Sequence, residues 1–458
     1  MKLARHIAAI VTALAIALAQ APVGVAAAKA RGPALPLIRD AEIEGLMRLY
    51  TRPIFKAAGI NPGAVRVYLL NDPRINAFVA GGQRIFVNTG LLVQAENPGQ
   101  VIGVLAHESG HIAGGHLARL GVEVDRASTT AIIGTLVGVA AIVGGAAAGQ
   151  NNTAKAGQGI MMGSQGLAQR NMLSYQRAME AAADQAALKY LTSSGQSARG
   201  MIQLFDKLAN QSIATIQNVD PYVVSHPMPF DRIRNLETAA RQSPYYDKPD
   251  APDLVLRHKL MQAKLHGFLD GPQIVFQLYP RSDTSMPARY ARAIAMFRQG
   301  DTKNSIPIIQ GLTEELPKNP YFWELLGQAQ LEGGVPARAV PPLRQAVKLL
   351  PNSGLIQILL AQALIATENK ANAKEALKAL RLAQKTEGEA PIVYSEMARS
   401  YAILGDFPRA DLATAESAWL RGDKALATQK AKAATKAFKT GTPEWTRAND
   451  ILNFAGRD

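Results

Sequence analysis

His107, Glu108 and His111 have the types and the spacing that metal-dependent hydrolysis requires. In a helix, residues four apart lie on one face about one turn from each other, so the two imidazoles can bind one ion. Glu108 is then placed to take a proton from a water molecule that the metal activates. The pattern predicts one Zn²⁺ per chain and a general base.

The helix that must carry this motif has a well-marked start. Asn97 can cap it, Pro98 fits its first turn, and Gln100 completes a capping box. An apolar face follows, formed by Val101, Ile102, Val104 and Leu105. Gly110, inside the motif, weakens the helix relative to alanine. The sequence therefore predicts a helix that begins at Asn97 and presents both histidines on one side.

A catalytic zinc ion needs a third protein ligand and one open position. A third histidine spaced as in a longer zinc motif would fall at position 117, which is leucine, and His116 is one residue short. We place His116 at the helix end or beside the ligands. Glu180 is the better candidate, because the alanine-rich segment 176–190 is typical of a helix. Asp184 lies one turn later on the same face, where it can hold a ligand imidazole N–H.

His226 stands in a loop punctuated by prolines, where a rigid backbone can aim a side chain. Two functional roles fit it: donating to the developing oxyanion, or occupying the open zinc position and holding the enzyme inactive. A structural role, capping the next helix, is the third interpretation. Arg232, six residues later, is a further candidate for stabilising the oxyanion.

Three segments together resemble a known family: HESGH at 107–111, EAAAD at 180–184 and SHPMPFDR at 225–232. They are similar to the HtpX and CAAX-prenyl-protease type of HExxH zinc peptidase. The resemblance implies a gluzincin-type peptidase domain with a small β-sheet over residues 36–245. It also implies these roles: zinc ligands His107, His111 and Glu180, general base Glu108, and Asp184 as the support of a ligand histidine.

Residues 76–82 and 85–92 resemble the strand pair that precedes the active helix in the same family. The resemblance implies that the strand around residues 82–88 is a sheet edge, to which an extended substrate adds as another strand. Substrate contacts are then expected at four positions: Gly82, Arg84, Phe86 and Asn88.

From Arg289 onward the sequence recurs every 34 residues, the period of a tetratricopeptide (TPR) helix pair. The clearest unit holds Trp323, Leu326, Gly327, Ala339, Leu343, Ala346 and Pro351. Stacked pairs of this kind form a concave surface for peptides or partner proteins. We predict an all-α repeat domain over 285–455, joined to the peptidase domain by a linker and connecting helix over 246–284. The fold class is α+β and mainly helical.

Composition and the N-terminal residues limit the cellular compartment and the classes of partner that this protein can have. The chain has 458 residues, no cysteine, 48% hydrophobic residues and a formal charge of +14. Without cysteine, disulfides and thiolate-bound metals are excluded. Residues 1–28 combine a basic start, a short apolar run and small residues, which is typical of a cleaved secretory signal. We therefore expect a periplasmic protein, and the absence of a basic run interleaved with aromatic residues argues against a nucleic-acid partner.

Residues 131–148 form an uncharged stretch whose composition is only weakly apolar. Gly134 and Gly138 have the GxxxG spacing, but four glycines weaken a water-exposed helix. We interpret the stretch as part of a buried or surface-lying helical hairpin. The other interpretation is a reversible peripheral contact with a membrane surface.

A zinc peptidase followed by repeats, behind a signal segment, resembles periplasmic peptidases that degrade stalled outer-membrane proteins and assist their assembly. The resemblance implies misfolded or unassembled envelope proteins as substrates and the outer-membrane assembly machinery as a partner of the repeats. The alternative function is a chaperone or scaffold whose peptidase is gated or mostly silent. The ligand pattern does not choose between them, because a complete ligand set does not show that a zinc position is open.

Overall fold

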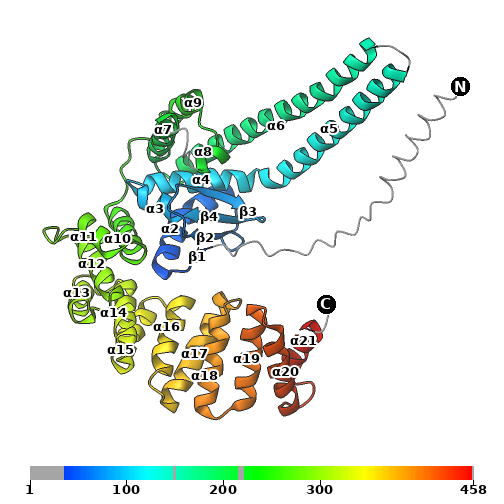
Figure 1. The fold of residues 1–458 in the computed structure, drawn as a ribbon. Helices are drawn as coiled ribbons and strands as arrows, with labels where there is room; N and C mark the ends of the chain where they lie inside the picture. The colour runs from blue at the N-terminus through cyan, green and yellow to red at the C-terminus, as the bar shows by residue number, and fades with distance from the viewer. Residues whose placement is uncertain (1–35, 148–150, 215–220, 456–458) are drawn as a thin grey trace. The chain divides into compact units, whose positions relative to one another are not determined.

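The computed structural model describes residues 36–147, 151–214 and 221–455. The predicted signal segment, residues 1–28, lies outside the described residues. The described chain is mainly helical and contains one small sheet near its N-terminal end, as predicted (Figure 1). Among the described residues, no helix has the length and apolar character needed to cross a membrane.

The first part of the chain contains the sheet and the helices around it. Its elements are β1 (Leu37–Ile38), α2 (Ala41–Ala58), β2 (Arg66–Leu70), β3 (Ala77–Ala80), β4 (Arg84–Asn88), α3 (Thr89–Gln94), α4 (Pro98–Ala113), α5 (His116–Ala147), α6 (Asn151–Ser193), α7 (Arg199–Ala214), α8 (Pro221–Ser225) and α9 (Phe230–Ala240).

The sheet has the strand order β1-β2-β4-β3. β4 runs parallel to β2 and antiparallel to β3, and it therefore lies in the interior of the sheet. Alternate residues on one face, among them Leu69, Ile85 and Val87, are buried in the main core with α2 and α4. This packing leaves β3 as the sheet edge beside α4.

The helix α4 begins as predicted, with the Asn97 side chain accepting a hydrogen bond from the Gln100 N–H. The Gln100 side chain in turn accepts from the Glu96 N–H. Gly110 has a packing role, because a side chain there would overlap the main chain of Ala183 on α6. The glycine that weakens the helix locally thus lets α6 approach α4 closely.

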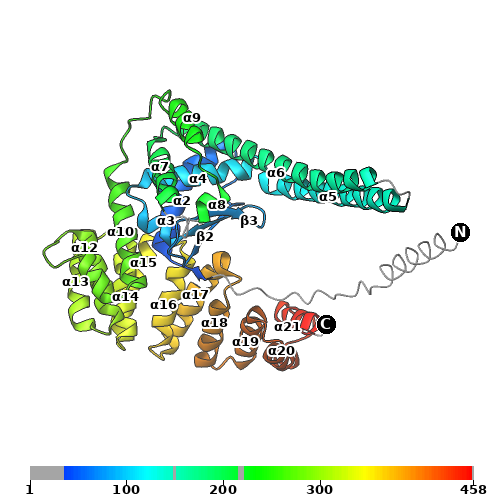
Figure 2. The ribbon, with the colours of Figure 1, turned by 45° about the horizontal axis from the view of Figure 1, so that its top comes forward.

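The helices α5 and α6 form a long antiparallel pair, with 32 and 43 residues, which Figures 1 and 2 show side by side along their length. The predicted helical hairpin is confirmed for residues 131–147, and residue 148 lies outside the described residues. Of the two alternatives, a buried hairpin is wrong. Large apolar side chains are exposed on both helices; Leu136, for example, is 65% exposed.

The remaining helices continue to the C-terminal end of the described chain. They are α10 (Pro252–Leu269), α11 (Pro272–Leu278), α12 (Met286–Arg298), α13 (Thr302–Glu315), α14 (Pro320–Glu332), α15 (Pro336–Leu349), α16 (Gly354–Ile365), α17 (Lys370–Glu387), α18 (Pro391–Leu404), α19 (Phe407–Arg421), α20 (Lys424–Ala437) and α21 (Pro443–Ala455).

The helix starts confirm the predicted repeat period. The helices α12, α14 and α16 begin 34 residues apart, and so do their partners α13, α15 and α17. Within one unit, Gly327 of α14 faces Leu343 of α15 so closely that any side chain at residue 327 would overlap it. The connecting region 246–284 holds α10. The side chains of Lys264 and His258 on this helix are buried, so α10 is packed against the rest of the protein.

Candidate metal centre

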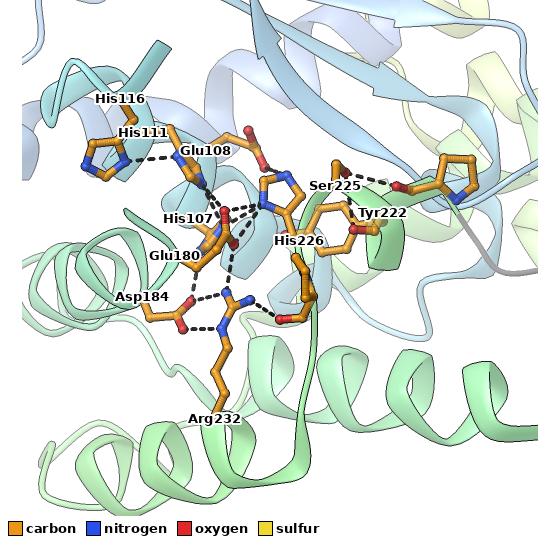
Figure 3. A network of polar contacts seen from close by, with 12 residues as sticks. His107, Glu108, His111, His116, Glu180, Asp184, Tyr222, Ser225, His226 and Arg232 are labelled. Carbon is orange, nitrogen blue, oxygen red and sulfur yellow. Dashed lines mark hydrogen bonds and ion pairs between the residues drawn. The ribbon is translucent and has the colours of Figure 1, made fainter. Parts of the chain in front are cut away.

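Four donor groups converge between α4, α6 and the residue that follows α8 (Figure 3). His107 and His111 come from α4, Glu180 from α6, and His226 lies directly after α8. All but His111 are buried. The structure thus brings together the three ligands expected from the sequence and adds His226 as a fourth donor.

The donor spacing fits a metal ion of the size of zinc. The Nε2 atom of His107 lies 3.0 Å from Nε2 of His111, 3.3 Å from Nδ1 of His226 and 3.3 Å from Oε2 of Glu180. Ligands at about 2.0–2.1 Å from a tetrahedral ion are separated by roughly 3.3 Å. Three imidazoles and one carboxylate are also a donor set that zinc accepts. The residues present therefore fit the ion that the motif implies.

Glu180 is the charged member of this group. Burial acts to raise the pKa of its carboxyl group, but hydrogen bonds with His107, His111 and His226 outweigh burial and hold that pKa well below its usual range. The group is therefore an ionised carboxylate, which is the form that binds a cation.

Glu108 is placed as the motif requires, with both carboxylate oxygens buried. Burial raises its pKa to about 7, against the opposing effects of His107, His111 and the main-chain N–H of Val79 on β3. Its Oε1 atom lies 3.4 Å from Nε2 of His226. A buried carboxylate with a pKa near neutrality is suited to accept and return a proton at that pH.

Asp184 and Arg232 lie behind the donors. Oδ1 of Asp184 is 2.9 Å from Nδ1 of His107, so that Nε2 of the same ring faces the metal position. Arg232 contacts Asp184 through two hydrogen bonds of 2.7 and 2.9 Å and approaches Glu180 at 3.1 Å. It also donates to the carbonyl of Pro227. Because these partners engage the guanidinium, the structure favours a positioning role for Arg232 over direct oxyanion contact.

His116 lies at the start of α5 and holds the other α4 histidine. Its Nδ1 atom is 3.0 Å from Nδ1 of His111. Nε2 of His111 points to the other donors, at 3.4 Å from Glu180. The prediction that His116 lies at a helix end beside the ligands is thus confirmed. The two motif histidines differ in their supports, since one has a carboxylate and the other an imidazole.

His226 does not have the structural role that was one interpretation of the sequence, since its ring points into the donor group rather than toward the next helix. The ring of Tyr222, four residues earlier on α8, is tilted by 34° to that of His226, with the ring centroids 4.6 Å apart. The Tyr222 hydroxyl is buried without a hydrogen-bond partner among the described residues. Sequence reasoning missed Tyr222, although its spacing from His226 by one helical turn was a usable signal.

The predicted substrate edge is wrong for the strand around residues 82–88. That strand is β4, whose main chain already pairs with β2 and β3. Asn88 is 2% exposed and donates to the carbonyl of Arg74, and Phe86 is stacked between two aromatic rings. Of the two edge strands, β1 and β3, it is β3 that lies next to Glu108. Gly82 and Arg84 are exposed at the turn between β3 and β4, and a substrate role for them stays a prediction.

Comparisons with known proteins agree with this geometry. Residues 41–240 match the model of Peptidase family M48. A Yersinia pestis protein named beta-barrel assembly-enhancing protease is 24% identical over 420 residues, which cover 90% of this chain and 83% of the relative. An Escherichia coli K12 protein of the same name is 23% identical, over 73% of this chain and 67% of the relative.

The crystal structure of MamA aligns with 36% of this chain and with 91% of the MamA chain, at 18% sequence identity. Its TM-score of 0.28 is too low to support an argument. The matched segment 41–240 contains every donor of the metal centre, the general base and both residues behind them. The chain therefore carries a metallopeptidase domain of family M48, and over most of its length it resembles proteins named beta-barrel assembly-enhancing protease.

Proposed function

We propose that this protein is a periplasmic zinc endopeptidase that cleaves misfolded or unassembled outer-membrane proteins. The observation that carries the proposal is the convergence of His107, His111 and Glu180 beside the buried carboxylate of Glu108. The names of the relatives support envelope proteins as the substrate class. The signal-like pattern of residues 1–28 supports the compartment.

His107, His111 and Glu180 would hold the zinc ion, which would supply Lewis acidity to polarise a peptide carbonyl and to make a water molecule easier to deprotonate. Glu108 accepts the proton of that water at its carboxylate and later returns it to the leaving amine. Asp184 keeps the proton of His107 on Nδ1, so that Nε2 stays available for the metal. The edge strand β3 can hold an extended substrate by main-chain pairing beside Glu108.

His226 acts as a gate in this proposal. With four protein donors, the metal position has no place for water, whereas catalytic zinc sites keep one position open. Nδ1 of His226 lies 2.9 Å from Oε2 of Glu180, inside the donor group. Cleavage therefore requires the His226 ring to move away. Once displaced, its imidazole can donate to the oxyanion, which combines the two roles considered for it.

A mostly silent peptidase that serves as a chaperone or scaffold is the second candidate function. The observation in its favour is the same fourth donor, because it closes the metal position. In both candidates the repeats bind the substrate or the assembly machinery on their concave surface, as stacked helix pairs of the TPR kind do.

The test measures bound zinc and cleavage of an unfolded outer-membrane protein in the same preparations. We expect about one zinc per chain in the parent and in Glu108→Gln, with cleavage lost in that variant. Glu180→Gln should lose both zinc and cleavage. The matched control is Glu96→Gln, at an exposed glutamate outside the centre, which should keep both.

Two outcomes would contradict the proposal. A parent protein that binds no metal would show that the proposed metal centre does not exist. A zinc-loaded parent that cleaves nothing would favour the scaffold. Faster cleavage by His226→Ala than by the parent would identify the gate.

A further inference from the structure

The hairpin of α5 and α6 exposes a group of apolar side chains that the proposed function does not use. They belong to the C-terminal half of α5 and the N-terminal half of α6, and Figures 1 and 2 show these halves of the hairpin extending away from the sheet. We call them the apolar band: Ile132, Ile133, Leu136, Val137, Val139, Ile160, Met162 and Leu167. Their exposed fractions run from 43% to 69%. Exposure of this extent at neighbouring positions indicates an interaction surface.

The band occupies one level of the hairpin on both helices. Gly134 of α5 lies directly against Ser164 of α6, which fixes the two helices in register at that point. Every member of the band lies within five residues of Gly134 or within four of Ser164. At 1.5 Å per residue, the band is roughly 12 Å deep along the helix axes.

The band also extends around the hairpin. At 100° per residue, the five α5 members cover an arc of roughly 160°. On α6, Met162 is two residues from Ile160 and five from Leu167. At 100° per residue, its side chain therefore points to a different side of the helix from theirs. Gly138 is buried, so the small residues face the partner helix while the large ones face outward. A peptide or one flat protein surface would cover one side of such a band, whereas a fluid apolar layer covers all of it.

The charges of the hairpin favour an anionic surface. Residues 127–179 contain no aspartate or glutamate. The three basic residues in this range, Lys155, Arg170 and Arg177, are exposed. Near the sheet the character changes, because exposed apolar residues there alternate with charged ones such as Glu123 and Arg126. An apolar, weakly cationic end and a charged base match the polarity gradient at a phospholipid surface.

We propose that the distal half of the α5–α6 hairpin inserts its apolar band into the outer part of a phospholipid layer that carries anionic headgroups. A depth of roughly 12 Å is close to that of amphipathic segments lying at the boundary of headgroups and acyl chains. The inference goes beyond the proposed function, since it requires neither zinc nor peptide cleavage.

The experiment is flotation of the zinc-loaded chain with two kinds of vesicle. One contains phosphatidylethanolamine and phosphatidylglycerol, and the other phosphatidylcholine alone. The parent should bind both, the anionic vesicles more tightly and with salt sensitivity. The double variant Ile133→Asp and Leu136→Asp should bind either vesicle at least tenfold more weakly. Lys155→Glu with Arg170→Glu should weaken binding to the anionic vesicles only.

The matched control is Phe407→Asp, which changes a 66% exposed apolar residue of the repeats and should leave binding unchanged. Far-ultraviolet circular dichroism and zinc content show whether the variants are folded. Absence of binding by the parent, or equal binding by the Ile133 and Leu136 double variant, would overturn the proposal. So would a concentration-dependent dimer in sedimentation velocity that this variant abolishes, because a second copy would then cover the band.

Discussion

Two kinds of antiparallel helix pair occur in this protein, and they treat apolar side chains differently. In the repeats, pairs such as α14–α15 consist of helices of 13 and 14 residues and bury Leu326 and Leu343. The α5–α6 pair is more than twice as long, yet it exposes Leu136 and its neighbours. Both pairs contain a glycine that faces the partner helix so closely that a side chain would overlap it, at Gly327 and at Gly134.

The difference lies in the neighbours. A repeat pair is followed by another pair 34 residues later, which covers the apolar side that one pair leaves open. The distal hairpin has no such neighbour among the described elements. Close packing of two helices therefore does not by itself bury large side chains, and a lone hairpin with an apolar exterior needs an external partner.

The largest effect is expected when a leucine inside a repeat pair is truncated. Leu343→Ala removes a fully buried side chain from a repeat pair, so we expect the free energy of unfolding of the repeats to fall by about 3 kcal/mol. Urea unfolding followed by circular dichroism measures the change. Leu382→Ala, at a 47% exposed position of the repeats, is the control. Equal effects of the two substitutions would show that burial does not distinguish them.

A smaller effect is expected at Glu324 of α14, which is close enough to Lys264 of α10 and to Asp40 and Glu42 at the start of α2 for their charges to act on it. Burial raises the pKa of Glu324 to about 8, with Lys264 opposing and Asp40 and Glu42 adding to the rise. Because the folded pKa exceeds that of an unfolded glutamate, the folded state binds more protons between about pH 4.5 and 8. The stabilisation that protonated Glu324 contributes is complete below this pH window and is lost as the pH rises through it.

Glu324→Gln should remove this pH dependence. Relative to the variant, the parent should lose on the order of 3 kcal/mol of unfolding free energy between pH 5 and 8. Urea unfolding of both proteins at several pH values measures the difference. Parallel pH profiles would show that folding does not raise the pKa of Glu324.

The smallest effect is expected in the hairpin. Leu136→Ala shortens a side chain that is 65% exposed, so the free energy of unfolding in vesicle-free buffer should change by less than about 0.5 kcal/mol. The same urea titration as for Leu343→Ala gives a direct comparison. A loss as large as that of Leu343→Ala would mean that the band is already covered in the protein alone.

The sequence predicted those parts of the structure that depend on local spacing. The start of α4 at Asn97, the shared face of His107 and His111, and the 34-residue period all follow from helix geometry and capping. Glu180 and Asp184 could be paired for the same reason. These features require only residues within a few turns of one another, or a strict repeat.

Features that depend on long-range packing were not predictable in this way. The resemblance placed the substrate on β4, but strand order is a tertiary property, and β3 became the edge. The ion pair between Arg232 and Asp184 joins residues 48 apart in the chain. Gly110 was interpreted as a local weakness because its neighbour, Ala183, is contributed by a different helix.

The length of α6 has a mechanical consequence. One unbroken helix of 43 residues carries Ile160 and Leu167 of the band and also Glu180 and Asp184 of the metal centre. Ser164 and Glu180 are separated by roughly 24 Å along its axis. A tilt of about 5° over this length displaces one end by roughly 2 Å, more than catalytic geometry tolerates. A displacement of α6 at the level of the band would thus reach Glu180, the carboxylate that we propose as a metal ligand.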